Sequence, residues 1–206
     1  MRGSLTATMA VTYDAAGNLL TLDGPLAGTA DTIRYRYDAG KRLVGIVGPA
    51  PDGAGTRKPA AQRITLNAYG AVTKVERGTV NSQSDADWSA FSPAESVVST
   101  YDVNARKGSD ILSSGGTNYA ARHYSYDALG RLDCAALRLN AAIYANLPAS
   151  ACALGIEGSF GPDRITKYQY DAAGWRFGDQ HSIAHCGPRA TSCEAEWMRR
   201  NIRITS

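Results

Sequence analysis

Apolar and polar residues alternate in several short segments of this 206-residue chain. Residues 33–37 read Ile-Arg-Tyr-Arg-Tyr, so the apolar and aromatic side chains would share one face and Arg34 and Arg36 the other. The same period of two recurs at 123–126 and at 167–170. Alternation of this kind is typical of a β-strand, in which successive side chains point to opposite faces.

Each alternating segment leads into a Tyr-Asp-x-x-Gly motif, which is clearest at 126–130. Aspartate at the first position and glycine at the fourth are the preferred residues of a type I turn. The carboxylate can accept a hydrogen bond from the backbone N–H two residues on, and the glycine takes a positive φ, as in a hairpin loop with a bulge. A second alternating segment follows, as at 20–22 and 72–75. Each motif therefore predicts one β-hairpin.

The motif occurs six times, twice in weakened form. Residues 66–70 have Leu and Asn in place of Tyr and Asp, and residues 101–106 have Ala at the Gly position. Chance Tyr-Asp pairs would lack the flanking alternation, so we interpret the copies as true internal repeats. The residues that carry them are Tyr13, Asp14, Gly17, Tyr35, Tyr37, Asp38, Tyr101, Asp102, Tyr124, Tyr126, Asp127, Gly130, Arg131, Tyr168, Tyr170, Asp171 and Gly174.

A row of such hairpins predicts a mainly β fold, in which antiparallel hairpins form a curved, open sheet. Insertions lie between the copies: a Gly- and Pro-rich loop at 48–55, a polar segment at 85–94 and a third insertion at 137–151. Residues 137–144 read Leu-Arg-Leu-Asn-Ala-Ala-Ile-Tyr, which predicts a short helix ending near Pro148. An open sheet of about six repeats leaves unpaired edges that need neighbours.

Composition excludes some classes of function. The formal net charge of +3 is too weak for a nucleic-acid-binding face, and the sequence lacks a membrane-length apolar run. The first residues show no charged region followed by an apolar core, so we expect no signal peptide in this chain. Four cysteines are too few for a disulfide scaffold at this length.

The repeats resemble those of the RHS, or YD-repeat, family, whose unit runs roughly Tyr-x-Tyr-Asp-x-x-Gly-Arg-Leu. The match is closest at 124–132, good at 35–43, where Lys41 replaces the glycine, and fair at 168–174. It covers about residues 10–177. In that family the hairpins form a sheet that spirals around a hollow shell, which usually encloses a toxic or unstructured C-terminal region. Members include bacterial polymorphic toxins, insecticidal toxin complexes and wall-associated proteins.

The resemblance implies a role and its limits. Larger members cleave themselves at a motif with an Asp-Pro pair, which this sequence lacks, so we carry over no catalytic residue and assign no cofactor. The implied partners are neighbouring RHS repeats or a C-terminal toxin region. The family has also been linked to carbohydrate binding, so glycans are a second class of partner. The implied location is secreted or at the cell surface, as part of a larger protein.

The side chains of the repeats have simple interpretations beside the chemical ones. The turn aspartates lie a repeat apart, so they are explained by their turns rather than as paired catalytic acids. The tyrosine rows suit a packed cross-strand ladder better than a sugar-stacking surface. We interpret Arg34, Arg36, Arg42 and Arg131 as solvated or cross-strand charges rather than as a phosphate site.

Two of the cysteines, Cys134 and Cys152, flank the helical insertion. A bridge between them would stabilise the fold by roughly 3 kcal/mol through loop closure. In a reducing cytosol the same residues would remain thiols. Both readings stay open at the level of sequence.

After Gly174 the repeat pattern is lost, so we divide the chain into a hairpin array at 1–177 and a divergent C-terminal tail at 178–206. The tail is either a capping segment or the product of a shifted frame or truncation. Its soft ligands could bind zinc or begin a histidine-based nuclease, but their spacing matches no zinc signature. These weak metal candidates are His181, His185, Cys186 and Cys193.

Three functions remain in view. The favoured one is a structural segment of an RHS-type shell that encloses or presents a secreted toxin region, with no catalysis of its own. The first alternative is a carbohydrate-binding surface on the same repeats. The second is a small metal-dependent effector in the C-terminal tail.

Overall fold

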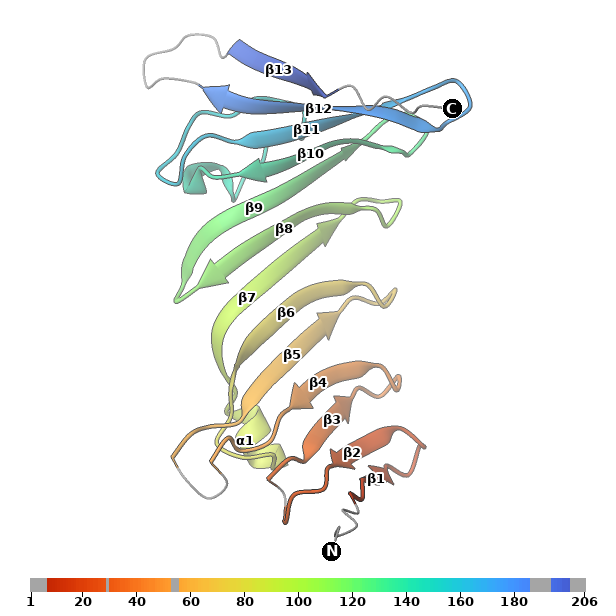
Figure 1. Ribbon diagram of the computed structural model, residues 1–206, viewed down its shortest axis with the longest axis vertical. Coiled ribbons are helices and arrows are strands. Elements are labelled where there is room, and N and C mark those ends of the chain that lie inside the picture. Colours follow the sequence, from red (N-terminus) through yellow and green to blue (C-terminus); the bar gives the residue numbers. More distant parts are fainter. Residues whose placement is uncertain (1–6, 29, 53–55, 186–193, 201–206) are drawn as a thin grey trace, which may run out of the picture. The chain divides into compact units, whose positions relative to one another are not determined.

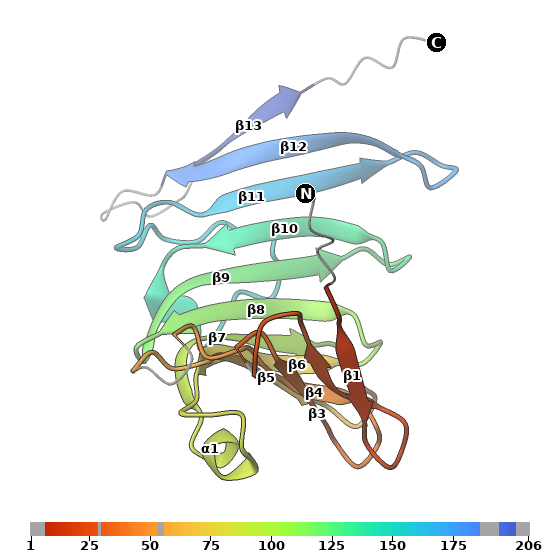
Figure 2. The same cartoon turned by 60° about the horizontal axis from the view of Figure 1, so that its bottom comes forward.

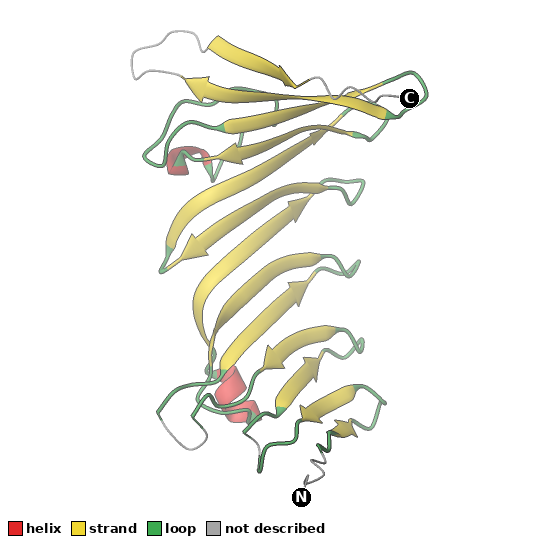
Figure 3. Ribbon diagram, viewed as in Figure 1, coloured by secondary structure: helices red, strands yellow, loops and turns green. Residues whose placement is uncertain are grey.

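The computed structural model describes residues 7–28, 30–52, 56–185 and 194–200, with side chains up to residue 180. It divides into two compact units, unit 1 at 1–96 and unit 2 at 97–206. Strands make up most of both units (Figure 3).

Unit 1 is a set of antiparallel strands that pair in chain order, β1 to β6, followed by a short helix (Figure 1). Hairpins β1–β2, β3–β4 and β5–β6 correspond to the first three repeats. The elements are β1 (Ala10–Tyr13), β2 (Leu19–Asp23), β3 (Ile33–Tyr37), β4 (Leu43–Val47), β5 (Ala60–Leu66), β6 (Val72–Thr79) and α1 (Asp85–Ser89).

Unit 2 continues the pattern, with β8 to β13 paired antiparallel in chain order, and β7 spans the boundary between the units. The prediction of a mainly β array of antiparallel hairpins in an open sheet is confirmed. The elements are β7 (Ser92–Tyr101), β8 (Lys107–Ser114), β9 (Thr117–Tyr126), β10 (Leu132–Arg138), the 3₁₀ turn η1 (Ala141–Ile143), β11 (Arg164–Tyr170), β12 (Arg176–His185) and β13 (Glu194–Arg200).

The hydrophobic core of unit 1 lies between its sheet and α1, because Trp88 of the helix packs against the buried cluster. Figure 2 shows α1 on one side of the strands of this unit. Val47 and Ala61, paired across β4 and β5, contribute two of its buried side chains. Trp88 of α1 packs against this cluster. Gly45 makes the approach possible, because a Cβ at that position would stand 2.6 Å from two ring atoms of Trp88.

Unit 2 has a corresponding core between strands β10 and β11 and the insertion that joins them. Cys134, Ala136 and Ile165 are buried on one face of β10 and β11, and Ala151 of the insertion packs on them. In both units, therefore, an insertion between hairpins folds back on the sheet. An insertion of this kind supplies apolar area that a single hairpin layer lacks.

The predicted helix at 137–144 was wrong in its extent. Leu137 and Arg138 complete strand β10, where alternate side chains face the core, and only Ala141–Ile143 form a 3₁₀ turn. The side chain of Asn140 caps that turn by accepting a hydrogen bond from the N–H of Ala142 at 3.1 Å. Strand pairing with β9 therefore outweighs the helix propensity of the first residues.

The five-residue helix α1 was not foreseen within the polar segment 85–94. Ser84 caps it, accepting a hydrogen bond from the N–H of Asp87 at 3.1 Å, and acidic residues occupy its first turn. Both are favourable helix-start signals. Both signals are present in the sequence, but the helix that follows has five residues, which is too few to show a helical period.

The backbone of the C-terminal tail continues the hairpin pattern. Strand β12 runs through the boundary proposed at 177/178 and pairs with β11 on one side and β13 on the other. Among the described residues, no helix is long and apolar enough to cross a membrane.

Candidate functional site

Each Tyr-Asp motif forms a tight turn held by its aspartate. In the fifth copy, the N–H of Gly130 donates to the carbonyl of Asp127 at 2.9 Å, and Gly130 has a φ of 79°. The Asp127 carboxylate accepts from the N–H groups of Leu129 and Arg131 at 3.0 and 2.9 Å. The bond two residues on is the one that the sequence predicts. The bond four residues on is an addition that closes the loop.

The other copies share this geometry, including the weak ones. Asn67 accepts from Tyr69 and Ala71 as an aspartate would, which explains why the amide is tolerated. Lys41 and Ala105 stand at the glycine position with φ values of 62° and 59°. Side chains with a Cβ are disfavoured in this left-handed region, so these two turns hold local strain.

An arginine four residues after the aspartate pairs with it in three of the turns. The Nε of Arg42, Arg106 and Arg131 each lies 2.7 Å from the second carboxylate oxygen of its own turn's aspartate. The hydrogen bond from Arg106 lowers the pKa of Asp102 below its usual value of 3.8. Of the arginines interpreted as solvated or cross-strand charges, Arg42 and Arg131 are thus local partners of the turns.

The same arginines reach the next hairpin across what we call a seam, the contact between the second strand of one hairpin and the first strand of the next. Arg131 lies over the ring of Tyr170, 4.4 Å from its centroid. The Tyr170 hydroxyl donates to the carbonyl of Leu132 at 2.9 Å. We call the turn aspartate, its arginine and the tyrosine of the next hairpin the seam clasp.

The seam between β8 and β9 repeats the clasp. Arg106 lies 4.6 Å from the ring centroid of Tyr126, whose hydroxyl donates to the carbonyl of Lys107 at 3.0 Å. Stacked guanidinium and aromatic groups attract each other by about 0.5–2 kcal/mol. The motif residues therefore join neighbouring hairpins as well as forming each turn.

Two seams of unit 1 lack one member of the clasp, and each leaves a groove. In the β4/β5 seam Leu66 replaces the tyrosine, and a groove of about 280 Å³ borders Arg42 and Leu66. In the β2/β3 seam Asn18 replaces the arginine, and a groove of about 430 Å³ borders Asn18, Tyr35 and Tyr37. We call the second one the first-seam groove.

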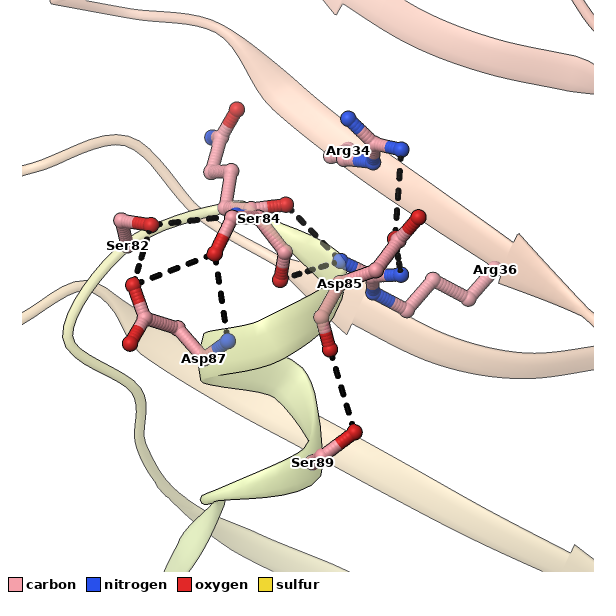
Figure 4. A network of polar contacts seen from close by, with 8 residues as sticks. Arg34, Arg36, Ser82, Ser84, Asp85, Asp87 and Ser89 are labelled. Carbon is pink, nitrogen blue, oxygen red and sulfur yellow. Dashed lines mark hydrogen bonds and ion pairs between the residues drawn. The ribbon is translucent and has the colours of Figure 1, made fainter.

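A polar network holds α1 against unit 1 (Figure 4). Arg36 bonds with Asp85 and donates to the carbonyls of Gln83 and Ser84 at 2.8 and 2.9 Å. Arg34 lies 3.4 Å from the same aspartate. Arg34 and Arg36 are thus ion-pair partners of the insertion, because their face of β3 is the one that the insertion covers.

In unit 2 the insertion is fixed by a fully buried ion pair. Arg138 and Asp163 meet at 2.8 Å with no side-chain exposure, and the Arg138 guanidinium also donates to the carbonyl of Ala151 at 3.0 Å. The Tyr144 hydroxyl donates to the carbonyl of Arg138 at 3.0 Å. These residues were not predicted from the sequence, because a buried pair 25 positions apart leaves no local signal.

Cys134 and Cys152 are joined by a disulfide in the structure, with Cα atoms 5.3 Å apart. Together with Asp133 they form the one group of potential metal ligands in the searched part of the chain, but bonded sulfurs do not offer thiolates to an ion. Cys186 and Cys193 lie outside the described residues. His181 and His185 lie on β12, where side chains are not described, so the metal hypothesis stays a prediction.

The remaining motif tyrosines occupy varied positions. Tyr13 on the first strand is 62% exposed, and Tyr168 lies under Arg176 at 4.6 Å within its own hairpin. The Tyr124 hydroxyl lies 3.4 Å from a carboxylate oxygen of Asp110. The tyrosine ladder stays a prediction.

The RHS Repeat family matches residues 13–53, which hold the first two turns and every residue that lines the first-seam groove except Asp85. The chain carries an RHS repeat. The resemblance drawn from the sequence is confirmed, and the same turn geometry recurs at RHS-like motifs as far as Asp171, whose carboxylate accepts from the N–H of Trp175 at 2.8 Å.

No curated protein matches the chain significantly. Solved structures similar to it include the Photorhabdus luminescens Tc holotoxin pore with a mutated TccC3 component, at 18% identity and a TM-score of 0.43, covering 85% of this chain and 9% of that one. Another is the crystal structure of TcdB2-TccC3-TEV, at 14% identity and a TM-score of 0.35, covering 87% and 11%. The chain thus spans about a tenth of their length. Similarities this low carry no conclusion about its function.

Proposed function

We propose that this chain is a structural wall segment of an RHS-type shell, which encloses or presents a toxin region of a larger secreted or cell-surface protein. The observation that carries the proposal is the seam clasp. It commits the repeated Asp, Arg and Tyr side chains to joining one hairpin to the next. Side chains that make these contacts extend the sheet from one hairpin to the next, and we assign them no catalytic role.

The clasp also explains how a wall can grow by repetition. The turns at Asp102 and Asp127 each supply an arginine to the following hairpin, whose tyrosine receives it, so the same interface can repeat along the array. Stability in such arrays is approximately a sum of repeat and interface terms. The natural partners of the chain are then further RHS hairpins on either side and the region that they surround.

Protease protection tests the enclosing role. The chain would be extended with RHS hairpins at both ends and followed by an unfolded, protease-sensitive reporter. We expect slow digestion of the reporter in this protein and faster digestion when Arg106→Ala and Arg131→Ala open two seams. Equal digestion in both proteins, with β-rich circular dichroism retained, would argue against enclosure. Selective binding on a glycan array would instead favour a recognition surface.

A further inference from the structure

The first-seam groove has the outline of a seam clasp that lacks its arginine. In the complete clasps of unit 2, the guanidinium lies between the aspartate of its own turn and the tyrosine ring of the next hairpin. In the β2/β3 seam, Asp14 and Tyr37 stand at those same motif positions. Both residues line the groove of about 430 Å³.

Asn18 occupies the arginine position but is too short to span the seam. Its amide donates to the second carboxylate oxygen of Asp14 at 2.8 Å, the oxygen that receives arginine Nε in the complete clasps. Strands β2 and β3 pair only through Thr21 with Arg34 and Leu22 with Ile33 among the described residues. The part of the seam nearest the turns is therefore unpaired, which leaves room for a side chain from elsewhere.

The cations already at this groove have their own partners. Arg34 and Arg36 bond with Asp85, and Arg36 also donates to the backbone before α1 (Figure 4). The Lys41 ammonium lies 3.4 Å from the carbonyl of Ala16. With Asp14 and the other lining carboxylates counted, acidic and basic groups at the groove balance. An added guanidinium therefore meets no excess of positive charge.

We propose that the first-seam groove binds the arginine side chain of another polypeptide segment. The guanidinium stacks on the ring of Tyr37 and donates to the Asp14 carboxylate, as Arg106 and Arg131 do within their own seams. Arginine is favoured over lysine because a planar guanidinium both stacks on a ring and donates from a fixed fork. This inference concerns a binding site and does not depend on the wall role proposed above.

The chain itself supplies the probe. The peptide acetyl-Gly-Arg-Leu-amide copies residues 130–132, and its lysine counterpart tests whether charge alone is enough. Binding would be followed by NMR of the full chain with labelled tyrosine rings, with the Tyr37 signals assigned from a Tyr37→Phe variant. We expect saturable shifts of the Tyr37 signals with the arginine peptide, and affinity about tenfold lower for the lysine peptide.

Two substitutions separate the groove from other sites. Asn18→Arg supplies the missing arginine within the chain, so it should lower the affinity for the peptide about tenfold or more. Leu66→Tyr restores the clasp in the β4/β5 seam and should leave binding unchanged. Circular dichroism and urea unfolding would establish that both variants fold.

Three results would overturn the proposal. They are no shift of the Tyr37 signals at millimolar peptide, equal affinity for the arginine and lysine peptides, and undiminished binding to folded Asn18→Arg protein. If Leu66→Tyr lost binding and Asn18→Arg kept it, the peptide would bind at the β4/β5 seam, which would also contradict the proposal.

Discussion

Ala105 occupies a turn position that its side chain disfavours. With a φ of 59° it stands where four of the six turns place glycine, as Gly130 does at 79°. Because the left-handed region costs a residue with a Cβ about 1 kcal/mol or more, Ala105→Gly should raise the free energy of unfolding by about 0.5–1 kcal/mol. Urea unfolding measures this change.

The reciprocal substitution at Gly130 is the matched control. Gly130→Ala should lower the free energy of unfolding by a similar amount, because it creates the strain that Ala105 already has. If Ala105→Gly and Gly130→Ala both lowered the free energy of unfolding, the Ala105 methyl group would stabilise its turn. That result would contradict the prediction.

The turn aspartates predict a dependence of stability on acid pH. The Arg106 hydrogen bond lowers the pKa of Asp102 in the folded protein, so the ionised carboxylate favours folding. That contribution is present above the unfolded pKa of about 3.9 and disappears as the pH falls through the lower folded value. Asp102→Asn should therefore make stability fall less steeply between about pH 5 and the folded pKa, as measured by urea unfolding at several pH values.

Asn67 provides the control for this effect. Its turn has Ala71 where the Asp102 turn has Arg106, so Asn67→Asp adds a carboxylate without an arginine in its own turn. The added group should change the acid dependence less than Asp102→Asn does. An equal change would show that the turn backbone, rather than the arginine, favours the ionised form.

Sequence reasoning succeeded for single residues where the physics is local. An aspartate that accepts from the N–H two residues on, and a glycine with positive φ, are properties of four or five consecutive positions. The partner of Arg131 could not be found in this way. Its ring, Tyr170, lies across an insertion of variable length, and only the paired strands bring the two together.

Helix α1 depends on a glycine in the strand beneath it. Gly45→Ala would place a Cβ 2.6 Å from the Trp88 ring, so the helix must shift or the ring must leave the core. We expect a loss of about 1–3 kcal/mol in the free energy of unfolding, as for other overpacked cores. Unfolding followed by tryptophan fluorescence would measure it.

Two variants show whether the loss comes from this contact. Gly48→Ala, where the nearest atom is the Ala60 carbonyl oxygen at 3.5 Å, should be nearly neutral. Combining Gly45→Ala with Trp88→Leu should cost less than the sum of the single changes, because residues in contact are not additive. Strict additivity would indicate that Gly45 matters for its backbone alone.

The insertion of unit 2 depends on its buried ion pair. Asp163→Asn removes the charge opposite Arg138, and an uncompensated buried charge typically costs about 3–5 kcal/mol. Replacing both partners, by Arg138→Met with Asp163→Leu, should cost less than the single change. Urea unfolding of the three proteins decides the matter, and a double variant less stable than Asp163→Asn would contradict this account.

These insertions mark where prediction from sequence failed at the level of elements. The strands were found because alternation repeats over many positions. The segment at 137–144 contains helix-forming residues, yet Arg138 is held in β10 by strand pairing and by a distant carboxylate. Helix α1 has a serine cap but only five residues, so its position is set by Trp88 and Asp85 rather than by its own pattern.

The two units should respond differently when a reductant opens the Cys134–Cys152 disulfide. The Cys134–Cys152 disulfide and the core around it belong to unit 2, and unit 1 has its own core around Val47 and Trp88. Closing a loop over a separation of 18 residues stabilises a fold by about 3 kcal/mol. A reductant should therefore lower the opening free energy of amides in β10 and β11 by about this amount, and leave those of β5 and β6 unchanged.

Hydrogen exchange followed by mass spectrometry resolves the two units in one experiment, because peptides from each report separately. The control is Cys134→Ala with Cys152→Ala, which keeps Cys186 and Cys193 and should show the weakened unit 2 with or without reductant. A response to reductant in that variant would assign the effect to the tail cysteines. Equal loss of protection in β5, β6, β10 and β11 would mean that the hairpins open as a single cooperative array and would contradict this prediction.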